Sequence, residues 1–514
     1  MTASAAGRAA VLAVCLTLAY TQLPLYSTNQ NTYFLHGLAQ SGFGHLANDW
    51  LAHTADAVPV FSALVRLTAG AWPPLFHLYT CVLFGIYLLG LLGIARQALA
   101  IRESSRTEWI LAVVLVALHS GLLGIASERA LGWNLPRLFE RGLADQYLLG
   151  PVLQPSNFGV LLIAAIVAAA RERRTLAIVC LGLAATFHPT YLLIVGVLAL
   201  TTVGVALRAG RGAGAAMKPG LLAAVLLLPI TAYVLLEFPP SAAHAAVSEI
   251  LVKVRLPHHA DIAQWFGPAS VFQILLMGAG LLLARGTALF PYLIWPFIAG
   301  AVLTLVQVVT QSASLALLFP WRFSVVLVPV STTLVVGRLL IWARDRIPRR
   351  WLAPPRLAQA AVAAALILLA ASGLAGTAVR FRSAVAPGDR ALFDAVRASG
   401  GANDLYLIPT TMEDFRLRAG VPVFVDEKNH PFRDADVMEW WQRILWTRRL
   451  GHAGADSVSA VMRELLAHYP VTMVVAASRD SAWARCDALA RWREVGGYTL
   501  YQVNAPPASS PGPP

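Results

Sequence analysis

The sequence predicts a polytopic α-helical membrane protein of about eleven transmembrane helices, followed by a C-terminal soluble α/β domain. Of its 514 residues, 57% are hydrophobic, which is more than a soluble multi-domain chain carries. Apolar runs long enough to cross a bilayer are separated by short polar connections. Every second connection is basic, and such loops mark the cytoplasmic side of a membrane. These observations predict a multi-pass protein with its N-terminus inside and its C-terminus outside.

About 20 apolar residues are needed for each crossing. The predicted spans lie near 8–26, 74–95, 109–126, 151–170, 175–188, 190–207, 219–237, 268–284, 288–309, 320–337 and 357–379. The run Thr175–Leu207 could also be a single long helix, but this would place the basic loop 208–218 outside. A break at His188–Pro189 avoids this, because proline suits the first turn of a helix and disfavours helix before it.

The net charge of +13 is concentrated in the membrane part of the chain. Residues 1–379 contain 24 Lys and Arg against 12 Asp and Glu, whereas residues 380–514 contain 16 against 15. The basic connections are 96–106, 171–174, 208–218, Arg285 and 338–356. This placement follows the positive-inside rule and shows no basic face with interleaved aromatics, so a nucleic-acid partner is excluded.

Three loops of the transmembrane domain (1–379) are predicted to be large and to lie outside: 27–73, 127–150 and 238–267. They hold most of the acids and histidines of this part of the chain. Ionisable groups near a bilayer are costly and usually face a cavity or a partner. An enzyme working on the outer side would need such groups, although ordinary polar loops would also contain them.

The segment 380–505 is predicted to be an extracytoplasmic α/β domain, and 506–514 a disordered tail. Helices are expected at 391–400, 435–450 and 458–469, and strands at 404–410, 421–427, 472–478 and 498–503. Around the second strand, Arg416, Arg418, Asp426, Lys428 and His430 form either a ligand site at a strand end or a solvated rim.

Asp49, in the first outer loop, is the residue best suited to acid–base chemistry. A carboxylate beside an aromatic residue and near the membrane can accept a proton from a hydroxyl nucleophile. The alternative is a helix cap or an ordinary loop aspartate. His36 and His45 in the same loop are candidate substrate-binding residues.

A second hypothesis concerns an anion site. Three predicted helices that run inwards begin at distinctive strings: QPSNFG with Gln154, HPTY with His188, and PWRF with Arg322. Their positive dipole ends point outwards and would bind an anion if they converge. The same outer loops supply further candidate groups for a phosphate: Arg137, Arg141, Arg255, His258 and His259. Capping by Ser156 and His188, and snorkelling of Arg322, are the alternatives.

Several chemistries lack sequence support. The chain has no Walker loop, HExxH, GxSxG or dinucleotide-binding motif. The four cysteines show no disulfide or metal-like spacing, and a single His-His pair is weak support for a metal. Metal-ligating residues are therefore unknown, and no cofactor is firmly predicted.

The inside N-terminus, long first outer loop with an acid, many spans and outer soluble domain resemble the GT-C superfamily of integral-membrane glycosyltransferases. The resemblance implies a sugar donor linked to polyprenyl phosphate and an extracytoplasmic acceptor in the cell envelope. It also implies Asp49 as the base, transfer with inversion, and a possible divalent metal, Mg²⁺ or Mn²⁺.

The strings NQNTYFLHGLA, QPSNFG, FHPTYLL and VDEKNHPF also resemble an uncharacterised group of bacterial multi-pass proteins. The expected location is the bacterial inner (plasma) membrane, with membrane lipids as further partners. A non-catalytic scaffold or a transporter of envelope polysaccharide assembly is the alternative function.

Overall fold

The computed structural model describes residues 5–210, 212–348, 354–454 and 457–504, so the predicted tail 506–514 lies outside them. The chain forms two compact units. The membrane unit comprises Met1–Leu23, Pro74–Leu235 and Leu251–Phe381, and the sheet unit comprises Pro24–Pro73, Leu236–Ile250 and Arg382–Pro514. The predicted domain border after residue 379 lies two residues before the border in the structure, which follows Phe381. The first outer loop and part of the third, however, fold with the C-terminal domain.

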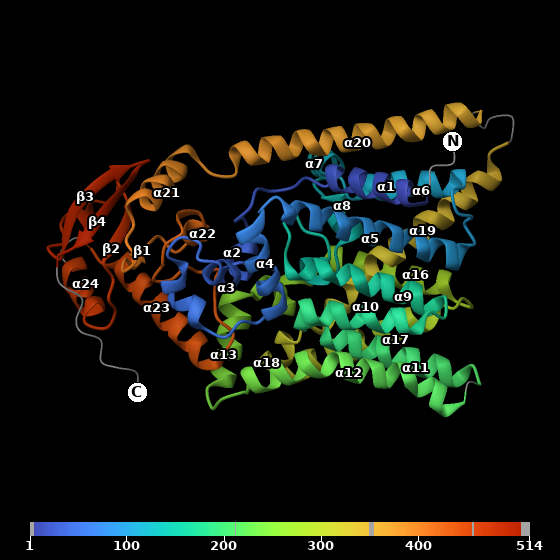
Figure 1. Cartoon of the computed structure of the whole chain (residues 1–514), viewed down its shortest axis with the longest axis horizontal. Helices are drawn as coiled ribbons and strands as arrows, with labels where there is room; N and C mark the ends of the chain where they lie inside the picture. Colours follow the sequence, from blue (N-terminus) through green and yellow to red (C-terminus); the bar gives the residue numbers. More distant parts are fainter. Residues whose placement is uncertain (1–4, 211, 349–353, 455–456, 505–514) are drawn as a thin grey trace. The chain divides into compact units, whose positions relative to one another are not determined.

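The membrane unit is helical throughout its described length (Figure 1). Its longer helices are α1 (Ala5–Ala19), α5 (Leu75–Leu99), α6 (Arg106–Leu118), α7 (Gly121–Leu131), α9 (Val160–Ala170), α10 (Arg174–Phe187), α11 (Leu192–Arg208), α12 (Ala213–Glu237), α16 (Pro268–Ala284), α17 (Phe290–Thr310), α19 (Ser324–Arg346) and α20 (Pro355–Ser383). Short helical segments connect them: α8 (Leu135–Glu140), η3 (Leu143–Asp145), η4 (Pro155–Gly159), η5 (Pro189–Tyr191), η6 (Leu251–Arg255), α14 (Pro257–Ala260), α15 (Ile262–Trp265), α18 (Ala313–Leu317) and η7 (Pro320–Phe323).

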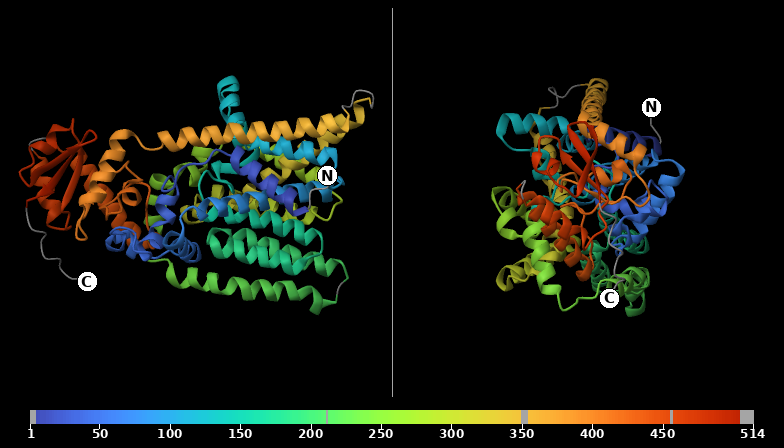
Figure 2. Two further views of the ribbon diagram at one scale, coloured as in Figure 1. Left: turned by 45° about the horizontal axis from the view of Figure 1, so that its top comes forward. Right: turned by 90° about the vertical axis from the view of Figure 1, so that its left-hand side faces the viewer.

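The number of long apolar helices is smaller than the eleven spans predicted. In the described residues, six helices are long and apolar enough to cross a membrane, or seven if α6 and α7 count as one broken span. These two helices are bent by 64°, and Figure 2 shows α7 turned away from the bundle. Four predicted spans are the shorter helices α1, η4 with α9, α10 and α16. Helix α10, for example, stops at Phe187 because His188 and Pro189 follow.

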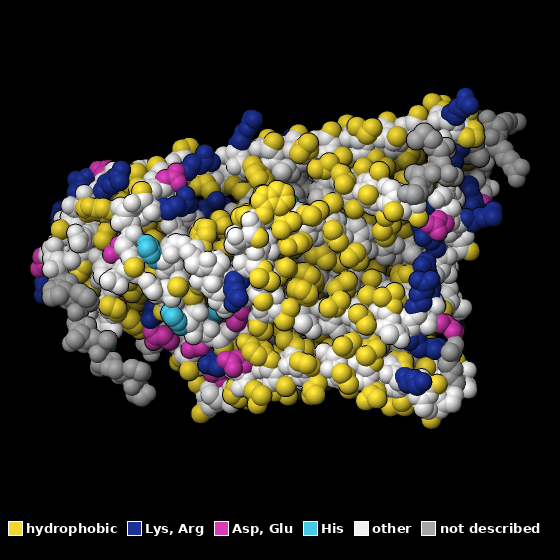
Figure 3. All heavy atoms as spheres, viewed as in Figure 1, with side chains coloured by type: hydrophobic (Ala, Val, Ile, Leu, Met, Phe, Trp, Pro, Cys, Tyr) yellow, Lys and Arg dark blue, Asp and Glu magenta, His cyan; other side chains and the backbone are white. Residues whose placement is uncertain are grey.

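Basic residues gather at one end of the membrane unit, where α1 and α6 begin and α5 ends. Arg8 forms ion pairs with Glu103 and Glu108, and Arg96 pairs with the same two acids. Arg8 and Glu108 are buried, so the contact fixes the three helix ends together. Figure 3 shows Lys and Arg at this end and hydrophobic side chains along the sides of the helices, as expected for a protein embedded in a membrane.

The sheet unit contains a mixed four-stranded sheet: β1 (Tyr406–Leu407), β2 (Met473–Ala477), β3 (Leu489–Val495) and β4 (Tyr498–Val503). The strand order is β1-β2-β4-β3, with β1 parallel to β2 and the other neighbours antiparallel. Three of the predicted strands are present. The predicted strand 421–427 forms only an isolated bridge from Val423 to Tyr406, and β3 was not predicted.

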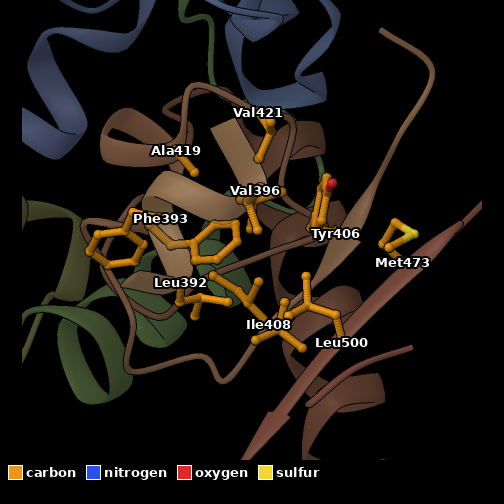
Figure 4. Packing of buried hydrophobic residues seen from close by; sticks show 12 residues of the cluster. Leu392, Phe393, Val396, Tyr406, Ile408, Ala419, Val421, Met473 and Leu500 are labelled. Carbon is orange, nitrogen blue, oxygen red and sulfur yellow. The ribbon is translucent and has the colours of Figure 1, made fainter. Parts of the chain in front are cut away.

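Helices cover this sheet and complete its core. They are α21 (Pro387–Ser399), α22 (Phe415–Ala419), α23 (Asp434–His452), α24 (Val458–Leu466) and α25 (Ser481–Ala484), and three of them match predicted helices. Figure 4 shows Leu392 and Phe393 of α21 packed towards Ile408 and Leu500 in a buried apolar cluster. The first outer loop and the third add α2 (Gln30–Tyr33), α3 (Leu35–Gln40), η1 (Leu46–Asn48), η2 (Trp50–His53), α4 (Pro59–Ala71) and α13 (His244–Ile250).

Candidate functional site

The three helix starts singled out in the sequence lie next to one another in the membrane unit. Each begins with a proline in the first turn of a 3-10 segment, namely η4, η5 and η7. The Tyr191 hydroxyl, at the end of η5, donates to the Ser156 carbonyl of η4 at 2.8 Å. The Arg322 guanidinium of η7 donates to the Thr190 hydroxyl of η5. The predicted convergence of these starts is therefore present.

The sequence suggested Ser156 and His188 as caps of these helix starts, but the structure shows different capping. At η4, the side chains of Gln154 and Asn157 form a reciprocal capping box, and Gln154 is buried. Gln154 is thus a structural cap, which corrects its predicted role as a ligand group. At η5 and η7, the residues before the helix, His188 and Phe319, provide no side-chain cap. Two starts therefore keep amide groups that their own caps do not satisfy.

The loops 127–150 and 238–267, together with the start of α16, line a pocket of about 440 Å³ beside these starts. Arg137 and Asp145 line it from the second loop, and His258 and Trp265 line it from the third. The two loops are joined by the His259 ring, whose Nδ1 lies 2.7 Å from the Ala144 carbonyl. The pocket has the size of an ordinary small-molecule site.

The backbone around this pocket is strained. Ala144 and Asp145 adopt consecutive left-handed conformations, with φ of 57° and 54°. Phe319, directly before η7, has φ of 48°. Such conformations are unfavourable for residues with a side chain and persist only where the surroundings hold them. Here the Gln273 amide donates to the Arg141 carbonyl at 2.9 Å and anchors the second loop to α16.

The side chains in and around the pocket carry excess positive charge. Arg141 forms an ion pair with Asp145 at 2.9 Å and stacks on the Tyr147 ring. Arg137 lines the pocket and is exposed. With Arg255 and Arg322, four arginines stand against two exposed carboxylates, Glu128 and Asp145. This balance favours an anionic ligand, and guanidinium groups match phosphate oxygens in geometry.

The two adjacent histidines do not add to this charge. Burial, followed by the neighbouring His258, lowers the pKa of His259 to about 4. Burial and the charge of Arg255 lower the pKa of His258 as well. Both rings are therefore neutral near pH 7, and His259 can donate its Nδ1 proton to the Ala144 carbonyl. They are hydrogen-bonding groups of the pocket and not cationic anchors.

Several buried donors near the pocket have no hydrogen-bond partner among the described residues. They include Nε1 of Trp265 and of Trp321, whose rings lie 4.9 Å apart, and Nε2 of Gln146. The Gln146 Oε1 accepts from Arg322 Nε at 3.0 Å, which orients the amide. Unpaired buried donors are costly, so a cluster of them indicates a place for an acceptor-rich ligand. The strings PWRF and AQWF contain both tryptophans, but nothing in them indicated this contact.

A buried ionisable cluster lies behind the pocket. Glu140, at the end of α8, is 7% exposed, and its Oε2 lies 4.0 Å from His119 Nε2. The Tyr20 hydroxyl lies 3.5 Å from its Oε1, and the Tyr87 hydroxyl lies 2.9 Å from His119 Nε2. Burial raises the pKa of Glu140 to about 7, although Arg141 opposes the shift. The neighbouring Arg141 connects this cluster to Asp145.

Asp49 does not have the environment of a general base. Its carboxylate is fully buried in the sheet unit and pairs with Arg416 Nε at 2.7 Å. The same oxygen accepts from the Val423 amide, and the other accepts from the Leu51 amide. Arg416 in turn pairs with Asp426 at 2.6 Å. The predicted catalytic role is corrected: Asp49 caps η2 and neutralises a buried arginine, so no oxygen faces a substrate.

His36 and His45 are also structural residues of the sheet unit. The His36 Nε2 lies 3.0 Å from the Thr54 carbonyl, beside a cavity of only about 10 Å³ that can hold no sugar. The His45 Nε2 lies 3.2 Å from the Gly400 carbonyl. Of the predicted tail cluster, Arg416 and Asp426 are buried and Arg418 pairs with Asp414 at 2.7 Å. Their predicted ligand-binding roles are not retained.

The described residues contain no set of three or more His, Cys, Asp or Glu side chains that could bind a divalent metal. Besides the carboxylates of Glu128 and Asp145, the pocket contains Arg137, the neutral His258 imidazole and the Trp265 indole. The excess of arginines over carboxylates in and around this pocket favours an anionic ligand.

A family model matches part of the C-terminal domain. Residues 388–447 match the family model described as "Domain of unknown function (DUF6798)". The match covers α21, β1, α22 and most of α23, and so includes Arg416 and Asp426 but no part of the pocket. No curated protein matches the chain.

Proposed function

We propose that the membrane unit binds the phosphate of a lipid-linked sugar and transfers the sugar to a hydroxyl acceptor on the outer side of the membrane. The observation that carries this proposal is the contact of η5 with η7 through Arg322, beside a 440 Å³ pocket that Arg137 and Asp145 line. An arginine-rich site at uncapped helix starts suits a phosphate, and membrane-spanning helices suit its lipid. The resemblance to GT-C glycosyltransferases agrees with this chemistry.

In this proposal the acceptor oxygen attacks the anomeric carbon as the bond from that carbon to the phosphate oxygen breaks. The bonding electrons leave with the phosphate, whose growing charge is stabilised by Arg322 and Arg137. The acceptor proton passes to Asp145, which pairs with Arg141 and is 51% exposed. A single displacement inverts the configuration of the sugar.

The topology belongs to the same proposal. The basic cluster of Arg8 and Arg96 would lie in the cytoplasm, according to the positive-inside rule. Helices α1, α11 and α19 run between that end and the pocket end, so the pocket and the sheet unit would be extracytoplasmic. The expected compartment is the inner membrane of a bacterium.

Binding and transfer can be tested separately. Purified full-length protein should bind farnesyl phosphate, and Arg322→Ala should weaken binding roughly tenfold to a hundredfold because a charge-assisted contact is lost. Arg322→Lys keeps the charge without the two-pronged geometry and should give an intermediate affinity. Arg285→Ala, at an exposed turn away from the pocket, is the matched control. Equal binding by all four proteins would place the phosphate elsewhere.

Transfer is measured with a panel of polyprenyl-phosphate-linked hexoses and pentoses. Asp145→Asn should slow transfer roughly 100- to 10,000-fold, as expected for loss of a general base, and should leave farnesyl phosphate binding within a few-fold of the original protein. If the original protein binds the lipid phosphate but transfers no sugar from the panel, the scaffold or transporter alternative is favoured instead.

A further inference from the structure

A second hollow in the membrane unit lies between α11 and α17 and is unrelated to the pocket described above. It is a groove of about 480 Å³ whose walls are apolar side chains such as Leu200, Trp295 and Val302. These three are 73%, 45% and 51% exposed, so the groove opens away from the protein core. Because both helices are candidate membrane spans, this face is turned to lipid.

The shape of the groove comes from small residues. Gly204 lines its floor, and a Cβ added there would meet no heavy atom within 4 Å. Thr201 also lines it, but its hydroxyl donates to the Val197 carbonyl at 2.7 Å and so adds no free polar group. An open apolar groove of this volume accommodates a hydrocarbon chain.

One end of the groove is charged. Arg208, the last residue of α11, lines it and has no ion-pair or hydrogen-bond partner among the described residues. From Val197 to Arg208 the helix rises by about 16 Å, at roughly 1.5 Å per residue. This is close to half of a hydrocarbon core about 30 Å thick, which is the depth of one leaflet. The arginine therefore stands at the height of a lipid headgroup when the groove holds its acyl chain.

We infer that this groove is a binding site for an anionic phospholipid, with one acyl chain against Gly204 and the headgroup phosphate paired with Arg208. The guanidinium supplies the charge complementarity that selects an anionic lipid over a zwitterionic one. The site is independent of the proposed reaction, because it shares no residue with the pocket and its headgroup end, Arg208, lies at the opposite end of α11 from Thr190. The inference of a lipid site applies to either orientation of the chain in the membrane.

Native mass spectrometry of the full chain tests this inference, because it counts bound lipids and subunits together. We expect phosphatidylglycerol to bind about tenfold more tightly than phosphatidylcholine. Arg208→Gln should abolish that preference, and Gly204→Leu should abolish binding of both lipids at this site by filling the groove. The controls are Arg338→Gln, an exposed arginine of α19, and Gly196→Leu, a second glycine of α11 with open space that does not line the groove. Both should bind like the original protein.

Three outcomes would overturn the inference. Equal binding of the two lipids by the original protein would remove the role of Arg208. Unchanged lipid binding by Gly204→Leu would place the lipid elsewhere. A dimer that Gly204→Leu converts to monomer, with lipid binding unchanged, would assign the groove to a second copy of the chain.

Glycerol 3-phosphate without acyl chains should compete poorly, which separates a lipid site from a simple phosphate site.

Discussion

Individual residues with similar appearance in the sequence have opposite roles in the structure. Asp49 and Asp145 are both acids of predicted outer loops, but Asp49 is fully buried and Asp145 lines a pocket. The difference arises from the partner: Arg416 and two backbone amides use the Asp49 oxygens, whereas Asp145 has one arginine and faces open space. An acid suits catalysis only if its environment leaves an oxygen accessible.

The first prediction concerns the buried charges around Arg416. Arg416→Gln leaves Asp49 and Asp426 buried without their cation and should lower stability by about 3–5 kcal/mol. Asp49→Asn should act in the same direction, because it leaves Arg416 with one partner. Arg418→Gln, on the same helix, removes a more exposed pair and should cost no more than about 1 kcal/mol. Thermal unfolding in detergent measures all three. Similar shifts for Arg416→Gln and Arg418→Gln would contradict the buried-triad account.

The second prediction concerns Glu140 and pH. Its pKa in the folded protein is raised to about 7, so the protonated carboxyl is the form that folding favours. The favourable contribution is complete below the unfolded pKa near 4.5 and is lost as the pH rises through about 7. Glu140→Gln resembles the protonated form. It should match the original protein at pH 4.5 and exceed it by about 3 kcal/mol at pH 8.

This prediction is checked by unfolding temperatures at several pH values. The groups that face Glu140 are Tyr20, His119, Arg141 and Asp145. Both proteins must therefore retain these four residues, so that Glu140 is the only titratable group that differs. A difference between the two proteins that is independent of pH would show that Glu140 does not titrate in this range.

At the scale of helices and segments, the site depends on three proline-led helix starts held in contact. Gly159 at the end of η4 allows this approach, since a Cβ there would lie 2.4 Å from the Tyr191 hydroxyl and 2.5 Å from Leu148 Cδ2. The hydroxyl of Tyr191 is the group that bonds to Ser156. Close packing at this glycine therefore sets the distance between the first and second starts.

The third prediction tests that contact. Gly159→Ala should cost about 1–3 kcal/mol through overpacking and should also weaken farnesyl phosphate binding, because η4 and η5 move apart. Gly196→Ala, on α11 where the added Cβ meets no atom within 4 Å, should instead be neutral or stabilise by about 0.5–1 kcal/mol. Thermal unfolding and lipid-phosphate binding of the two variants are the measurements. If Gly159→Ala is as stable as Gly196→Ala, the packing argument fails.

For the whole molecule, the sheet unit constrains how the chain crosses the membrane. It is one compact body made from three segments, so all three lie on the same side. The number of crossings must then be even between residues 73 and 236, and again between 250 and 382. The second interval contains three long apolar helices: α17, Ala313–Arg346 and α20. Helix α16, with 17 residues, is the element that can supply a fourth crossing.

The fourth prediction follows from this parity. In a protein whose four cysteines are replaced, Ala288→Cys after α16 should be labelled only from the side opposite to Ala242→Cys in the sheet unit. A membrane-impermeant thiol reagent applied to intact cells and to inverted vesicles makes the measurement. Labelling of both positions from one side would mean that α16 does not cross and that another segment between 250 and 382 does.

Local sequence determined the helices, the proline-led starts and the alternating charge of the connections. These features depend on neighbouring residues: apolar length, proline geometry and the position of arginines. The sheet domain was also predictable in outline, since α21, α23, α24 and three strands follow from periodicity. The span count was overestimated because helices such as α1 and α10 have 15 and 14 residues, fewer than the about 20 that a crossing needs.

Tertiary structure alone decided which ionisable residues are available for function. Arg416 is 367 residues from Asp49, and Arg322 is 176 residues from Gln146, so no local pattern indicates either pair. The first outer loop joins the C-terminal domain for the same reason: burial of its charges and apolar side chains is satisfied only by distant segments. Burial and pairing are properties of the folded chain, and they turned the most conspicuous acid of the sequence into a structural residue while leaving Asp145 at the pocket.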